Sequence, residues 1–145
     1  MRHSFLYGRI IVPFDGSSGS WNALRKAVQL AKGMNAEITI LSVEEPLPHY
    51  EETAREVQEE RKRETAFFAD LQSKAVLLSE EQGVHPRTEI LAGNAAQIII
   101  RRAQEENVDL IVIGQSGHSG VWGLLLGSTT ARVVDHAQCD VLVVR

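Results

Sequence analysis

The sequence predicts an α/β protein, with one doubly wound, five-stranded parallel sheet and helices on both faces. Two observations lead to this fold class. Short apolar runs alternate along the chain with longer segments of helical periodicity, which is the order of βαβ units. The run at residues 110–113 is wholly apolar, as expected for a strand that is buried on both faces of a parallel sheet. The length of 145 residues fits a single domain, so we expect residues 1–145 to form one unit.

The first half of the chain predicts two strands and a helix. A strand is expected at residues 9–14, where regular pairing ends because Pro13 cannot donate to a ladder. A serine of the following turn caps a helix over residues 20–32, and Gly33 is placed to end that helix. β-Branched residues predict the second strand at 38–43, and a proline-containing loop follows at 44–49.

The middle of the chain predicts a long, charged helix over residues 50–82, ended by Gly83. Its first half, residues 51–63, has the glutamate–arginine pairs of a solvated helix face; a charge run that binds a partner is the alternative. Charged and apolar residues alternate at 85–91, which indicates a third strand with one wet face at the edge of the sheet.

The last third predicts a helix over residues 95–105, whose start resembles a capping box because Gln97 follows Asn94 by three residues. The strand at 110–113 comes next. A helix at 128–136 and a fifth strand at 141–144 close the chain.

One stretch, residues 108–130, carries the functional prediction. After the buried strand comes a loop with glycines at 114, 117, 120, 123 and 127, and then Ser128, Thr129 and Thr130 begin a helix. Glycines let the backbone approach a ligand closely. A helix start adds unpaired N–H groups, hydroxyls and the positive end of the helix dipole. Together these features predict an anion site, and phosphate is the usual anion.

Asp15 turns this phosphate prediction into a nucleotide prediction. Ligands of such sheets bind beyond the carboxyl ends of the strands, and Asp15 ends the first strand. An acid there suits ribose hydroxyls or, through water, a magnesium ion. The alternatives are an ordinary helix-start acid for Asp15 and, for Gly114 to Ser128, a glycine-rich connection with an N-cap serine.

The motif Gly114-x2-Gly117-x9-Gly127-Ser128 resembles the G-x2-G-x9-G-[S/T] signature of the universal stress proteins, and nearly the whole chain is similar to that family. The resemblance is to the ATP-binding subclass. It implies strand order 3-2-1-4-5, a homodimer through the last strand, and ATP between strands one and four. It places Pro13, Phe14 and Asp15 beside the adenosine, the Val43 backbone at adenine, Ile113, Gly114 and Gly117 along the loop, and Gly127, Ser128, Thr129 and Thr130 at the phosphates.

The sequence departs from the family in one respect. Many members carry Arg or Lys in the nine-residue spacer, whereas residues 118–126 have neither. His118 is the titratable group of the spacer and is mostly neutral at pH 7; it either contacts phosphate or is a surface loop residue. Phosphate charge would then rest on N–H groups, hydroxyls, the helix dipole and magnesium, so we expect modest affinity that depends on Mg²⁺.

Composition and motifs narrow the function classes. A net charge of −4 gives no general basis for binding nucleic acid or an anionic membrane, and no stretch approaches the ~20 apolar residues of a membrane span. Cys139 is the single cysteine, which indicates a reducing compartment and hence the cytoplasm. The histidines lack zinc-ligand spacing, and no catalytic motif occurs.

Three functions remain open. The first is an ATP-binding stress-response or regulatory protein with an unidentified protein client. The second is a weak ATPase or nucleotide hydrolase, with His118 or Asp15 as the base. The third is a nucleotide-free, dimeric interaction module.

Overall fold

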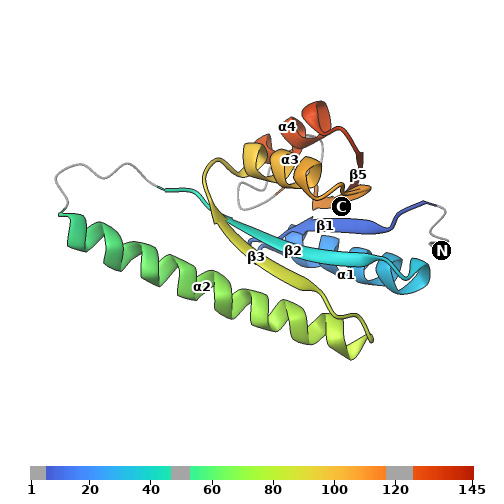
Figure 1. Cartoon of the computed structure of the whole chain (residues 1–145), viewed down its shortest axis with the longest axis horizontal. Helices are drawn as coiled ribbons and strands as arrows, with labels where there is room; N and C mark the ends of the chain where they lie inside the picture. The colour runs from blue at the N-terminus through green and yellow to red at the C-terminus, as the bar shows by residue number, and fades with distance from the viewer. Residues whose placement is uncertain (1–5, 47–52, 117–125) are drawn as a thin grey trace.

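Five parallel strands form one sheet in the order β3-β2-β1-β4-β5, as the family resemblance implies (Figure 1). The computed structural model describes residues 6–46, 53–116 and 126–145. The elements are β1 (Arg9–Pro13), α1 (Ser18–Met34), β2 (Glu37–Glu44), α2 (Ala54–Glu81), β3 (Arg87–Ala92), α3 (Ala95–Glu105), β4 (Leu110–Gly114), α4 (Ser128–His136) and β5 (Asp140–Val144). The predicted fold class is therefore confirmed.

Two apolar cores lie on the two faces of the sheet. Ile10 and Val12 of β1 pack with α1 and the second half of α2, whereas Ile11 packs on the opposite face with α3 and α4. β4 divides its side chains in the same way, so all five of its residues are buried. This burial explains why β4 is apolar at every position, whereas no residue of the edge strand β3 is fully buried.

The winding direction reverses at β1, which fixes where a ligand crevice can form. β1 pairs with β2 on one side and with β4 on the other, through Ile10–Leu110 and Ile11–Ile111. The helices that follow β1 and β4 therefore leave toward opposite faces, and a gap opens beyond the carboxyl ends of these two strands.

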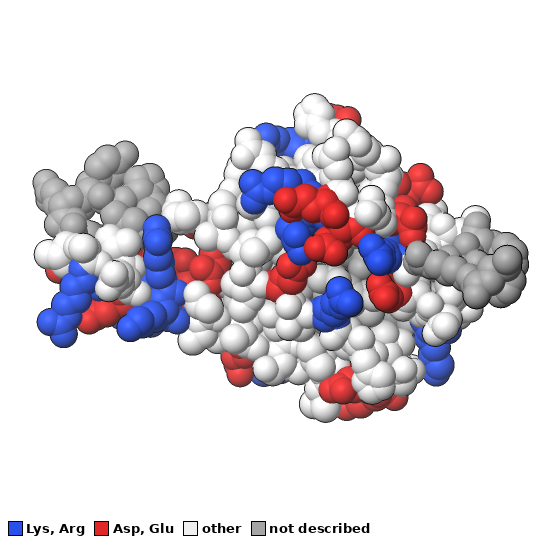
Figure 2. All heavy atoms as spheres, in the orientation of Figure 1, with Lys and Arg blue, Asp and Glu red and all other residues white. Residues whose placement is uncertain are grey.

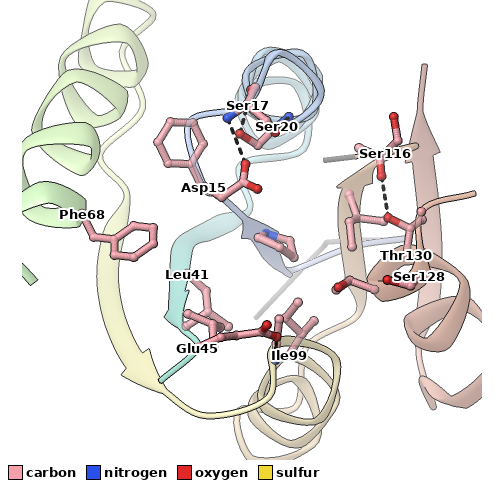
Figure 3. Close-up of a pocket in the computed structure, with 18 of the residues that line it drawn as sticks. Asp15, Ser17, Ser20, Leu41, Glu45, Phe68, Ile99, Ser116, Ser128 and Thr130 are labelled. Carbon is pink, nitrogen blue, oxygen red and sulfur yellow. Dashed lines mark hydrogen bonds between the residues drawn. The ribbon is translucent and has the colours of Figure 1, made fainter. Parts of the chain in front are cut away.

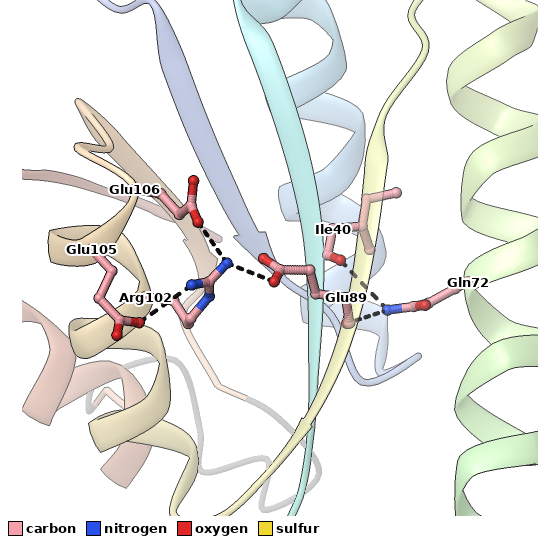
Figure 4. Close-up of polar contacts among 6 residues, drawn as sticks. All are labelled: Ile40, Gln72, Glu89, Arg102, Glu105 and Glu106. Atoms are coloured by element: carbon pink, nitrogen blue, oxygen red, sulfur yellow. Dashed lines mark hydrogen bonds and ion pairs between the residues drawn. The ribbon is translucent and has the colours of Figure 1, made fainter.

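Polar contacts tie α2 and α3 to the exposed strand β3 (Figure 4). The Gln72 amide of α2 donates to the Glu89 carbonyl at 2.7 Å, and the Arg102 guanidinium of α3 donates to the Glu89 carboxylate at 2.7 Å. Arg102 also pairs with Glu105 and Glu106. Hydrogen bonds to the Glu89 carboxylate raise the pKa of Arg102 against the opposing effect of burial. β3 is thus held from both faces despite its exposure.

The surface drawn in Figure 2 mixes charges of both signs. Acidic and basic side chains lie together over α3, where Arg102 meets Glu89, Glu105 and Glu106, and over the first turns of α2. This face therefore offers no continuous basic patch. In the described ranges, no helix has both the length and the apolar character needed to cross a membrane.

The predicted boundaries of two helices are wrong, and α1 also begins at Ser18 instead of residue 20. α1 continues through Gly33 to Met34 and ends at Asn35, whose φ of 52° is left-handed. Asparagine tolerates this conformation, and the Ala36 N–H donates to the Ala31 carbonyl at 3.0 Å to close the turn. α2 begins at Ala54 instead of residue 50, because Thr53 and Glu56 form a capping box that the sequence prediction overlooked.

The other helix starts show which residues cap. Ser17 caps α1, as the serine prediction requires, and the Asn94 side chain accepts from the Gln97 N–H at 3.1 Å. The N-cap residue of α4 is Gly127, which has no side chain that could accept a hydrogen bond from the first N–H groups of the helix. The alternative of Ser128 as an N-cap serine is therefore wrong: Ser128 is the first residue of the helix.

Candidate functional site

A cavity of about 510 Å³ lies beyond the carboxyl ends of β1, β2 and β4 (Figure 3). Ten residues predicted from the sequence line it: Pro13, Phe14, Asp15, Val43, Ile113, Gly114, Gly127, Ser128, Thr129 and Thr130. The other two predicted residues, Gly117 and His118, fall outside the described residues. The structure thus brings together, around one cavity, residues that are more than 100 positions apart in the chain.

The turn after β1 forms one wall and is fixed by hydrogen bonds. The Ser42 hydroxyl donates to the Phe14 carbonyl at 2.6 Å, and the Gln72 amide donates to the Ser42 hydroxyl at 3.1 Å. Asp15 accepts from the Ser17 N–H at 2.9 Å, so its carboxylate helps to start α1 as well as lining the cavity. The helix-start interpretation of Asp15 therefore describes its position, and its contact with ribose or magnesium stays a prediction.

The end of β4 forms the opposite wall, and here the backbone of α1 comes unusually close. A β-carbon on Gly114 would lie 2.7 Å from the Gly19 carbonyl carbon, and one on Gly19 would lie 2.4 Å from the Ser116 carbonyl oxygen. Both positions need glycine for packing alone. Gly114 was predicted to let the backbone approach a ligand, whereas no sequence pattern singled out Gly19.

The N-terminus of α4 supplies hydrogen-bond donors to the cavity. Ser128 is exposed and Thr129 is half-buried, and the first N–H groups of a helix have no acceptor within that helix. Thr130 differs, because its buried hydroxyl donates to the Gly114 carbonyl at 2.7 Å and ties α4 to β4. A phosphate contact by Thr130 stays a prediction, and it would involve the backbone.

The side of the cavity formed by α2 and α3 was not predicted from the sequence. Phe67 and Phe68 of α2 line it, together with Leu41, Glu45 and Ile99. The two rings pack edge to face with centroids 5.6 Å apart, and Phe67 remains 59% exposed. Adjacent aromatic residues in a charged helix are the signal that could have been noticed.

The lining has acidic but no basic side chains among the described residues. Asp15 and Glu45 contribute carboxylates, whereas no lysine, arginine or histidine borders the cavity in the described ranges. Those ranges also contain no group of three acidic, histidine or cysteine side chains that could hold a metal ion. An anion in this cavity would be held by N–H groups, hydroxyls and the helix dipole.

Comparisons with known proteins agree with this geometry. The family model described as "Universal stress protein family" matches residues 6–145. The universal stress protein MJ0531 of Methanocaldococcus jannaschii is 36% identical over 143 residues, which cover 97% of this chain and 83% of that protein.

Solved structures resemble the chain along its whole length. The universal stress protein UspA from Lactobacillus plantarum is 31% identical, with a TM-score of 0.88 and coverage of 97% of this chain and 99% of that one. A universal stress protein in complex with cAMP is 27% identical, with a TM-score of 0.75 and coverage of 96% and 97%.

Proposed function

Because this chain belongs to the universal stress protein family, we propose that it binds an adenine nucleotide, ATP with Mg²⁺, in the cavity between β1 and β4. The bound nucleotide would regulate its contacts with a protein client, as a stress-response protein of the ATP-binding subclass. The observation that carries this proposal is that the cavity lining is mainly apolar at one end and carries hydrogen-bond donors at the other.

The two ends of the cavity suit the two ends of a nucleotide (Figure 3). Phe68, Leu41 and Ile99 form a largely apolar end in which Glu45 is the charged side chain, while Ser128 and the α4 N-terminus form an end rich in hydrogen-bond donors. In this view Asp15 lies between Phe68 and Ser128, where it can accept from ribose hydroxyls. Apolar walls with a few placed polar groups are typical of cofactor sites, and helix N-termini are typical of phosphate sites.

Magnesium follows from the charges of the lining. An exposed helix terminus contributes only about 0.3–1 kcal/mol toward binding an anionic group. Two carboxylates and no cationic side chain border the described part of the cavity, so the triphosphate charge needs another counter-ion. Phosphate oxygens together with a carboxylate such as Asp15 are ligands of the type that Mg²⁺ takes.

Two further proposals concern assembly and compartment. We propose a homodimer through β5: this strand pairs with β4 on one side, and its residue Leu142 is 36% exposed, which leaves an edge that a second copy can cover. We propose a cytoplasmic location because Cys139, the single cysteine of the sequence, is a free thiol.

The test is titration of nucleotide-free protein with Mg-ATP by calorimetry. Any co-purified nucleotide is first released by denaturation and identified, and the protein is refolded after the nucleotide has been removed. The key variant is Ser128→Asp, and Ser18→Asp is its matched control. Each serine is exposed and is the first residue of its helix, but Ser18 does not line the cavity.

The two variants should separate helix stability from binding. A carboxylate in the first turn favours either helix, so neither variant should unfold more easily than the wild type. Only Ser128→Asp places a negative charge beside the proposed phosphates, and it should weaken Mg-ATP binding by about tenfold or more. Unchanged affinity of Ser128→Asp for Mg-ATP would contradict the placement of the phosphates at this end of the cavity. Absence of a binding signal in calorimetry with any nucleotide would favour the interaction-module hypothesis.

A nucleotide with fewer charges is a second candidate ligand. One solved relative is a complex with cAMP, and a ligand with a single phosphate charge suits a lining without described cations. Titration with cAMP and AMP under the same conditions decides between them and ATP. Tighter binding of cAMP in the absence of Mg²⁺ would replace ATP as the proposed ligand.

A further inference from the structure

Glu45 is a cavity residue to which the proposed nucleotide site assigns no role. It follows β2 directly, and its Oε1 accepts a hydrogen bond from the Ala95 N–H at the start of α3, at 2.8 Å. Both residues line the cavity, and Figure 3 shows the Glu45 side chain between Leu41 and Ile99. Among the described residues, its other oxygen, Oε2, has no hydrogen-bond partner. Glu45 therefore presents one held oxygen and one oxygen that can accept from a ligand.

The position of Glu45 is at the apolar end of the cavity, where the proposed function places the base. With ribose at Asp15 and phosphates at α4, the base extends toward Phe68 and Leu41. The purine edge farthest from the sugar carries position 6, which is an amino group in adenine and a carbonyl in hypoxanthine. A carboxylate oxygen accepts hydrogen bonds and cannot donate them, so these two groups have opposite effects beside it.

Resting on the proposed nucleotide site, we propose that Glu45 determines base specificity. Its Oε2 accepts a hydrogen bond from the 6-amino group, so the site selects 6-amino purines and rejects 6-oxo purines, whose carbonyl oxygen would face the carboxylate. A hydrogen bond to a charged group is worth about 1.5 kcal/mol or more, which corresponds to about tenfold in affinity.

The test compares Mg-ATP with Mg-ITP, which differ at position 6 and in the proton that the inosine base carries on the neighbouring N1. Both are titrated calorimetrically into nucleotide-free wild type, Glu45→Gln and Glu45→Ala. The wild type should prefer ATP by about tenfold. In Glu45→Gln the Ala95 N–H still needs an oxygen acceptor, so the amide NH₂ replaces Oε2 and donates; the preference should reverse toward ITP. In Glu45→Ala the preference should disappear.

Asn94→Ala is the matched control for the helix. Asn94 caps the same end of α3 through the Gln97 N–H but does not line the cavity. This variant loosens α3 without removing the Glu45 carboxylate, so it should keep the wild-type preference for ATP. Loss of the preference in Asn94→Ala would show that helix position decides it, and would overturn the inference.

The remaining outcomes separate this inference from the proposed function. Equal binding of ATP and ITP by the wild type, or an unchanged ATP preference in Glu45→Ala, would overturn the role of Glu45 while leaving the nucleotide site in place. Failure of the wild type to bind either nucleotide would overturn the proposed function and this inference with it.

Discussion

Replacing Gly19 by alanine should destabilise the protein through a backbone contact. The added β-carbon would lie 2.4 Å from the Ser116 carbonyl oxygen and near the Cα of Gly114. Both neighbours are backbone atoms, so no side chain can rotate away, and α1 must move off the end of β4. Overpacking of this kind typically costs about 1–3 kcal/mol. We expect a loss of about 2 kcal/mol, which in a domain of this size lowers Tm by about 4–8 °C.

Gly33→Ala supplies the matched control because it makes the same substitution in the same helix. A β-carbon on Gly33 meets nothing within 4 Å, and the residue is exposed near the end of α1. The change should therefore stabilise the protein by about 0.5–1 kcal/mol, since alanine favours helix and restricts the unfolded chain.

Urea unfolding followed by far-UV circular dichroism measures both variants against the wild type. The reasoning requires opposite signs: a lower free energy of unfolding for Gly19→Ala and a higher one for Gly33→Ala. Equal stabilisation by the two alanines would show that α1 and β4 are farther apart than the structure has them. Gly19→Ala should also weaken nucleotide binding, because the displaced Ser116 lines the cavity.

Two further predictions concern magnesium and the thiol. Mg-ATP binding should weaken at least about tenfold in excess chelator, since no cationic side chain borders the described lining; equal affinity with and without chelator in calorimetry would contradict this. Burial raises the pKa of the Cys139 thiol above its ordinary 9.0, so a smaller fraction is thiolate in the folded protein at pH 8. Iodoacetamide should therefore modify Cys139 more slowly in the native state than in urea. Because the pKa of Cys139 is higher in the folded than in the unfolded protein, the neutral thiol contributes to the free energy of unfolding below pH 9. This contribution decreases as the pH rises through the pKa of the folded protein.

The sheet was predictable because its signals are local and strong. The apolar run in β4 and the β-branched run in β2 leave few alternatives to buried strands. The end of α1 was harder, because glycine and asparagine both tolerate the left-handed conformation and they stand two residues apart, at 33 and 35. The chain takes asparagine, which leaves Gly33 inside the helix. Only the order of the strands needed the family resemblance, since no local pattern encodes which strands pair.

The cavity was predictable on one side only. The β4–α4 side is a continuous stretch with a spaced glycine motif, so its residues could be named together. The other side depends on where the long helix α2 crosses the sheet, which brings Phe68 opposite Ile99 from segments that share no motif. Glu45 could not be identified either, because its orientation is set by the Ala95 N–H, 50 residues further along the chain.

The close contact between Gly19 and Gly114 changes what the glycine motif proves. Gly114 must be glycine for α1 to reach β4, so its presence would be the same in a protein that bound no nucleotide. Ser128 and the start of α4 differ, because Ser128 is exposed and no side chain caps this helix. The case for a nucleotide therefore rests on the α4 end of the cavity and its apolar opposite end. Ser128→Asp tests the first, Glu45→Gln tests which base the second selects, and neither variant changes the glycine contact between α1 and β4.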